Sequence, residues 1–128
     1  MKILLPVAVL CSLSLTCFAK TPVSRVHFGR GASSTVLRGY STQRQPDHIY
    51  IVRARRGQTL KMSISSSTKG FVPLFFLTSP SGRNLIEDKR YSYRAKLKEN
   101  GDYRIRVTVN LMATDAVRGN YRVPLSVR

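Results

Sequence analysis

Short segments in which apolar and polar residues alternate, separated by glycine-centred turns, constrain the fold of this chain more than any other feature. The pattern is clearest over residues 58–65, 103–109 and 121–127. A period of two residues places successive side chains on opposite faces of an extended chain, which is typical of a half-buried β-strand. The turns that punctuate the pattern contain Gly57, Gly82, Gly101 and Gly119.

The same reading along the chain predicts eight strands. They cover residues 25–28, 34–40, 48–54, 58–65, 72–78, 91–97, 103–109 and 121–127. No segment has a sustained helical period. Short, regularly spaced strands with turn signals are typical of a sandwich or a flattened barrel. We therefore expect an all-β protein, a small antiparallel β-sandwich of about eight strands with no long helix.

The alternation also predicts which side chains face the core. The expected inward set is Ile49, Ile51, Leu60, Met62, Ile64, Leu74, Phe76, Ile105, Val107, Val123 and Leu125. The Asn100-Gly101 dipeptide predicts a hairpin turn over residues 99–102. The rings of Tyr103 and Tyr121 should cap the core while their hydroxyls reach a partner. Pro124 predicts an unpaired side or a bulge in the last strand.

Residues 1–19 have the features of a signal peptide. Lys2 supplies the positive charge, residues 3–15 are apolar, and Cys17-Phe18-Ala19 places small residues where a signal peptidase cleaves. The apolar stretch is too short to span a bilayer comfortably, and no second one follows. We therefore expect residues 20–128 to form one soluble, periplasmic domain.

Charge and cysteine usage narrow the class of protein further. Both cysteines lie in the predicted signal peptide, so the domain would be exported without a disulfide, which favours a bacterial periplasmic protein. Lys2 is the only charged residue in that segment, so cleavage lowers the formal charge only from +16 to +15. This charge predicts attraction to polyanions, while export argues against nucleic acid as a specific partner.

Residues that could support catalysis are few. His27 and His48 are far apart and lack the spacing of a zinc site, and no Gly-x-Ser-x-Gly nucleophile motif is present. Glu87 and Asp88 are adjacent, so on an extended chain their carboxylates would point apart. We expect no enzyme activity, no metal and no cofactor.

Several motifs resemble a known family. They are Gly-Gln-Thr-Leu-Lys-Met-Ser-Ile at 57–64, Leu-Phe-Phe-Leu-Thr-Ser-Pro-Ser-Gly at 74–82, Gly-Asp-Tyr-Arg-Ile-Arg-Val at 101–107 and Asn-Tyr-Arg-Val at 120–123. This order resembles the bacterial pre-peptidase C-terminal type of β-sandwich and, more closely, the periplasmic inhibitors of goose-type (g-type) lysozyme. Further matching residues are Val26, Phe28, Gly31, Ser33, Ser34, Tyr50, Asp115 and Ala116.

The resemblance implies a rigid sandwich that inserts loops into the active-site cleft of a host g-type lysozyme and so protects peptidoglycan. In that family the loop before the last strand supplies arginines, and here it is residues 110–119, with Arg118 as its only arginine. Arg118 would pair with the catalytic carboxylic acid, and Asp115 would brace Arg118 or contact the rim. Asn110 begins the same loop and belongs to the expected lysozyme-binding set.

The loop before the third strand also contributes in the family, typically with an aromatic residue. Residues 43–45 are Gln-Arg-Gln here, so Arg44 would be the second residue that enters the lysozyme cleft. An alternative function follows from the charge alone. Outward-facing Lys61, Arg104 and Arg122 would suit a non-catalytic basic β-sandwich module that binds anionic cell-envelope glycans.

Overall fold

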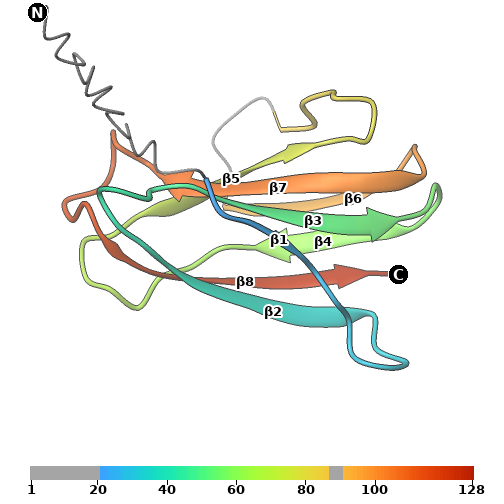
Figure 1. Cartoon of the computed structure of the whole chain (residues 1–128), viewed down its shortest axis with the longest axis horizontal. Helices are drawn as coiled ribbons and strands as arrows, with labels where there is room; N and C mark the ends of the chain where they lie inside the picture. The colour runs from blue at the N-terminus through green and yellow to red at the C-terminus, as the bar shows by residue number, and fades with distance from the viewer. Residues whose placement is uncertain (1–20, 87–90) are drawn as a thin grey trace, which may run out of the picture.

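The computed structural model describes residues 21–86 and 91–128, and these form eight strands in two packed sheets (Figure 1). The strands are β1 (Val23–Arg25), β2 (Ser34–Ser41), β3 (His48–Ala54), β4 (Thr59–Ser63), β5 (Pro73–Thr78), β6 (Ser92–Lys96), β7 (Gly101–Val109) and β8 (Gly119–Val127). The prediction of a small all-β sandwich is therefore confirmed. The predicted signal peptide and the pair Glu87 and Asp88 lie outside the described residues.

The two sheets have the strand orders β1-β3-β7-β5 and β2-β8-β4-β6. All pairings are antiparallel except that of β1 with β3, which is parallel with Val23 opposite Ile49. Strands that follow one another in the chain always lie in opposite sheets. Every connection between described strands thus crosses the sandwich. In the part of the chain that the structure describes, no helix is long and apolar enough to cross a membrane.

The prediction of a β-hairpin at residues 99–102 was wrong, because the chain crosses between the sheets there. The chain does turn there, and Gly101 has a φ of +131°, but β6 and β7 lie in different sheets. The Asn100 side chain accepts a hydrogen bond of 2.7 Å from the backbone N–H of Arg56, in the turn that joins β3 to β4. This hydrogen bond joins the two turns at one end of the sandwich. The local turn signal therefore predicted the bend correctly, but it did not predict which strands pair.

The core lies between the sheets and contains most of the expected side chains. Those confirmed in the central cluster are Leu60, Met62, Ile64, Ile105, Val107, Val123 and Leu125. The prediction for β3 was wrong, because Tyr50, Val52 and Ala54 face inward while Ile49 and Ile51 are half-buried on the outer face. Both alternating sets of β3 are apolar, so the period of two could not choose between them.

The prediction for β5 was also wrong in its choice of face. Phe75 and Leu77 belong to the core cluster, whereas Leu74 is buried outside that cluster and Phe76 is half-buried. The guanidinium of Arg106 lies 4.9 Å from the centre of the Phe76 ring, so this phenylalanine is covered on the outer face by a cation.

The predictions for Tyr103, Tyr121 and Pro124 agree with the structure, whereas the first strand, expected at residues 25–28, runs over Val23–Arg25. Tyr103 is buried, and its hydroxyl donates a 2.8 Å hydrogen bond to the carbonyl of Glu99. Tyr121 is buried and its hydroxyl also has partners in the core. The ladder between β4 and β8 stops after Met62 and Leu125 and resumes only at an isolated bridge beyond Pro124. Pro124 therefore has an unpaired side, as a residue without an N–H requires.

Candidate functional site

Three loops meet at one end of the sandwich: residues 42–47, 64–72 and 110–118 (Figure 1). Strand register puts them there. Ser41 at the end of β2 pairs with Gly119 at the start of β8, and Pro73 at the start of β5 pairs with Val109 at the end of β7. We call this surface the loop end. It brings together the two segments that the sequence predicted for lysozyme binding.

The 110–118 loop is held in one shape by the neighbouring 64–72 loop. The carbonyl of Gly70 accepts hydrogen bonds from the backbone N–H groups of Asp115, at 2.8 Å, and Ala116, at 3.0 Å. The Thr114 hydroxyl accepts a 3.1 Å hydrogen bond from the backbone N–H of Val72. Gly70 has a φ of +79°, and a Cβ there would lie 3.3 Å from the Asp115 side chain. The close approach therefore favours glycine.

Asn110 lies inside this loop rather than on its surface. The residue is only 5% exposed, and its side-chain amide donates a 2.7 Å hydrogen bond to the Tyr91 hydroxyl. Its side-chain oxygen also accepts a 3.2 Å hydrogen bond from the backbone N–H of Met112. Both ends of the amide are thus used to shape the loop, so Asn110 positions its neighbours instead of offering a free group to a partner.

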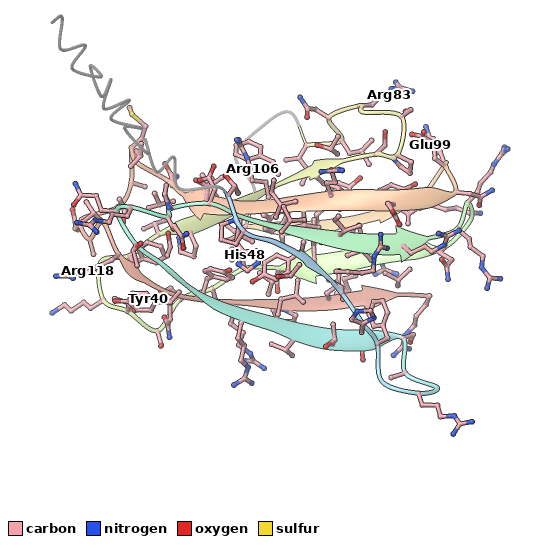
Figure 2. The ribbon with its side chains drawn as sticks, in the orientation of Figure 1. Tyr40, His48, Arg83, Glu99, Arg106 and Arg118 are labelled. Carbon is pink, nitrogen blue, oxygen red and sulfur yellow. The ribbon has the colours of Figure 1, made fainter. Side chains whose placement is uncertain are left out.

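The other three predicted residues are exposed at the loop end. Arg118 (Figure 2) immediately precedes the Gly119–Ser41 pair and so adjoins the 42–47 loop. Arg44 is exposed in that loop. Asp115 is exposed on the same loop as Arg118. Among the residues that the structure describes, no ion pair joins Asp115 to Arg118. The expected brace between them is absent, and both charges face solvent.

The 42–47 loop is also ordered by its own hydrogen bonds. The buried Ser41 hydroxyl donates to the carbonyl of Pro46 at 2.8 Å. The Thr42 side-chain oxygen accepts from the backbone N–H of Gln45 at 3.0 Å, and the Thr42 N–H donates back to the Gln45 carbonyl at 3.2 Å. Arg44 therefore projects from a closed, preorganised turn.

Sequence reasoning missed the apolar part of the loop end. Leu111 and Met112 are 77% and 86% exposed, and Val117 and Tyr40 are also exposed. Tyr40 lies at the base of the 42–47 loop, on the same end as Arg118 (Figure 2). Large exposed apolar side chains on a surface that also carries charges are typical of a protein-binding surface. The signal available in the sequence was the Leu-Met pair in a segment that lies outside the predicted strands.

A chain of polar contacts runs beneath the loop end. The Ser24 hydroxyl lies 2.9 Å from Nε2 of His48, and Nδ1 of His48 lies 3.2 Å from the Tyr121 hydroxyl. Burial lowers the pKa of His48 and raises the pKa of Tyr121. A serine–histidine pair begins a hydrolase triad, but a protonated phenol stands where a triad has its carboxylate. These contacts connect β1, β3 and β8 as a structural link.

Metal ligands do not gather anywhere in the described ranges, which contain no group of three or more histidine, cysteine, aspartate or glutamate residues. The described carboxylates that make ion pairs do so with arginine. Asp102 accepts two hydrogen bonds from Arg25, at 2.9 and 3.0 Å, and these hold the pKa of its carboxyl below the usual value. Asp47 lies 3.8 Å from Arg106. These pairs tie β1 and the 42–47 loop to β7.

No protein-family model matches this sequence, and no curated protein matches it either. The fold is nonetheless shared with solved structures. One is Aeromonas hydrophila PliG, described as a periplasmic lysozyme inhibitor of g-type lysozyme, with a TM-score of 0.70 and 20% identity over 85% of this chain and 98% of that one.

Two further structures have the same fold. Salmonella Typhimurium PliG, with the same description, has a TM-score of 0.65 and 22% identity over 85% of this chain and 100% of that one. The pre-peptidase C-terminal domain of Bacillus anthracis collagenase has a TM-score of 0.60 and 16% identity over 85% and 97%. The expected likeness to both groups is thus found at the level of the fold.

Proposed function

We propose that this protein is a periplasmic inhibitor of g-type lysozyme that inserts its loop end into the lysozyme cleft and so protects peptidoglycan. The observation that carries the proposal is the loop end itself. Two braced loops there present Arg118 and Arg44, and the 110–118 loop also carries the exposed apolar side chains of Leu111 and Met112. The sandwich that carries them has the fold of two proteins described as inhibitors of g-type lysozyme.

The chemistry of a lysozyme cleft suits this surface. Glycosidases that cleave peptidoglycan use a carboxylic acid as general acid, set in a groove that accepts a sugar chain. A guanidinium on a projecting loop can pair with such a carboxyl group through two parallel hydrogen bonds. We assign this role to Arg118, with Arg44 as a second contact. Asp115 would meet donors at the rim of the cleft.

The apolar side chains would supply much of the affinity. Burying exposed Met112 and Leu111 in a groove removes apolar surface from water, and methionine adapts its shape to an irregular partner. Because the 110–118 loop is already fixed by its bonds to Gly70, little conformational entropy is lost when it docks. Asn110 would act indirectly, by holding the loop in its inserting shape.

Cellular location and lack of catalysis complete the proposal. An inhibitor of this kind meets lysozyme in the periplasm, so residues 1–19 would serve as the export signal. The serine–histidine contact at Ser24 and His48 takes no part in it. The protein would block hydrolysis by occupying the cleft and would not itself turn over a substrate.

A panel of lysozymes tests the proposal. The purified protein is mixed with goose-type, hen-type and invertebrate-type lysozymes, and lysis of cell-wall substrate is followed. We expect inhibition of the goose-type enzyme at micromolar or lower concentration and weaker or no inhibition of the other two. Full activity of all three enzymes in the presence of excess protein would reject the proposal.

A further inference from the structure

The outer face of the β2-β8-β4-β6 sheet carries cations and, among the described residues, no carboxylate. Its exposed basic side chains are Arg38, Lys61, Arg94, Lys96, Arg122 and Arg128. The described acidic residues lie elsewhere: Asp47 and Asp102 by the other sheet, Glu99 before β7, and Asp115 in the 110–118 loop. We call this surface the basic face.

Like charges stand directly opposite each other on the basic face. Arg38 pairs in register with Arg122, and Lys61 with Arg94. Cross-strand pairs of like charge destabilise a sheet. In the other sheet Arg53 instead pairs in register with Asp102, a charge of opposite sign. Isolated cations are common on a solvated sheet face, where their aliphatic stems cover apolar atoms. Two cross-strand pairs of like charge, with no described carboxylate beside them, are not accounted for in this way.

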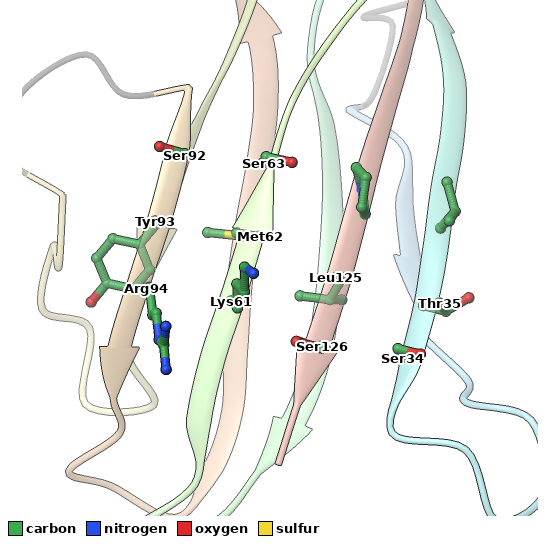
Figure 3. Close-up of a pocket in the computed structure, with 12 residues that line it drawn as sticks. Ser34, Thr35, Lys61, Met62, Ser63, Ser92, Tyr93, Arg94, Leu125 and Ser126 are labelled. Atoms are coloured by element: carbon green, nitrogen blue, oxygen red, sulfur yellow. The ribbon is translucent and has the colours of Figure 1, made fainter.

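A depression of about 640 Å³ lies on this face and is lined by residues of all four strands (Figure 3). Its outward-facing lining consists of Ser34, Val36, Lys61, Ser63, Ser92, Arg94, Pro124 and Ser126. It is hollow because four serines, a valine and a proline are short, while Lys61 and Arg94 are long. A second hollow of about 440 Å³ shares Lys61, Arg94 and Ser126 with the first and extends it to Arg128.

We propose that this depression binds a linear acidic polysaccharide. Lys61 and Arg94 supply the charge that acidic groups on the chain require. The serine hydroxyls can donate to and accept from sugar hydroxyls. The half-buried Val36 and Pro124 give the apolar floor on which the C–H face of a sugar ring can lie. β8 is nine residues long, which corresponds to about 30 Å of extended chain, so the face accommodates several sugar units.

Other polyanions fit the depression less well. Single-stranded nucleic acid is held by aromatic side chains on which bases stack. The aromatic residue in the lining, Tyr93, instead packs against the core cluster. Binding to a lipid surface needs exposed apolar side chains that enter the headgroup region. Here the apolar floor is half-buried and surrounded by hydroxyls.

The depression and the loop end lie at different ends of the β2–β8 ladder. The depression includes Ser34 and Ser126, which pair at the end of the β2–β8 ladder farthest from Ser41 and Gly119. A protein held on an acidic polysaccharide by this face would therefore leave its loop end free. The inference does not depend on the proposed inhibition of lysozyme, and the two are tested by different variants.

Titration with oligogalacturonate, a linear carboxylated glycan, tests the inference by calorimetry at low and moderate salt. The test variant is Lys61→Gln with Arg94→Gln. The control is Arg53→Gln with Arg104→Gln, which makes the same change in charge on the outer face of the other sheet. We expect the test variant to lose at least about tenfold in affinity, because two charge-assisted hydrogen bonds are lost, and the control to change little.

A third variant, Ser63→Leu, fills the depression without changing the charge and should weaken binding several-fold. Neutral dextran, polyuridylate and phosphatidylglycerol vesicles serve as competing ligands. An equal loss of affinity in the two double variants would mean that net charge alone attracts the glycan, and it would overturn the inference. Tighter binding to polyuridylate or to vesicles than to the acidic glycan would overturn it as well. Lysozyme inhibition should be unchanged in all three variants, which separates this result from the proposed function.

Discussion

The hydroxyls of Tyr50 and Tyr121 lie 2.6 Å apart in the core and join β3 of one sheet to β8 of the other. Their rings meet edge to face, with centroids 6.4 Å apart. Burial raises the pKa of both phenols, so both are protonated at neutral pH and one donates to the other. This bond fixes how the two sheets align near the loop end.

The losses of stability from removing these two hydroxyls should not be additive. Tyr121→Phe leaves the Tyr50 hydroxyl without its partner in the core, at a cost of about 1–3 kcal/mol. In the double variant Tyr50→Phe with Tyr121→Phe no phenol hydroxyl is left unpaired and only Nδ1 of His48 loses its partner, so the loss should be smaller than the sum of the single losses. Urea unfolding of the four proteins measures this coupling, and strictly additive losses would contradict it.

Sequence patterns could predict the strands but not their partners. The bounds of β3 were predicted to the residue, and the glycines at 57, 82 and 101 do adopt positive φ. The local signal at Asn100-Gly101 gives the bend, but the crossing to the other sheet depends on long-range contacts such as that between Asn100 and Arg56. The face of β3 could not be predicted because Ile49 and Tyr50 are both suited to a core.

Gly39 lies opposite Tyr121 in the β2–β8 ladder, and this position should not tolerate a larger residue. A Cβ at Gly39 would overlap the hydroxyl oxygen of Tyr121. Gly39→Ala should therefore displace the ring and cost about 1–3 kcal/mol of stability.

A matched control for this change is Gly29→Ala, because a Cβ there would have its nearest neighbour at an ordinary 3.8 Å. We expect a change within about 0.5 kcal/mol for this variant. Thermal unfolding compares the two proteins. Equal melting temperatures for the two alanine variants would show that the space beside Tyr121 is not needed.

Stability should fall as the solution becomes acidic through the pKa of histidine. Burial lowers the pKa of His48 below its ordinary value of 6.5, so the unfolded chain binds a proton more readily than the folded one. The stabilisation is complete above about pH 6.5 and is lost as the pH falls from there toward the lowered pKa of the folded protein. His48→Gln should remove this part of the pH dependence. Denaturation curves between about pH 8 and about pH 5.5 measure it, and the same slope in both proteins would assign the effect to other groups.

Side chains at the loop end should control inhibition without controlling folding. Arg118→Ala and Met112→Ala remove exposed groups, so stability should be unchanged. Inhibition of g-type lysozyme should weaken by about tenfold or more in each variant, as is typical when an interface hot spot is truncated. Arg30→Ala, in the exposed turn before β2 at the other end, is the matched control. Equal inhibition constants for the three variants would place the contact elsewhere on the protein.

The candidate site could be predicted only in part for a physical reason. Arg118, Asp115 and Arg44 carry charges in loops, and such residues are exposed, as expected. Asn110 is the same kind of polar loop residue, yet it is buried because its amide closes the loop onto Tyr91. Conversely, Leu111 and Met112 are exposed although apolar side chains usually face the core. Exposure in a loop depends on its hydrogen bonds, which sequence patterns do not reveal.

The central claim is that the loop end occupies the active-site cleft of a g-type lysozyme. The most direct measurement is the initial rate of peptidoglycan hydrolysis at several substrate concentrations while the protein is titrated against the enzyme. The account predicts that the apparent KM rises with inhibitor concentration, that kcat is unchanged, and that one molecule of protein inactivates one of lysozyme. An unchanged rate at micromolar excess, or a fall in kcat at constant KM, would contradict it.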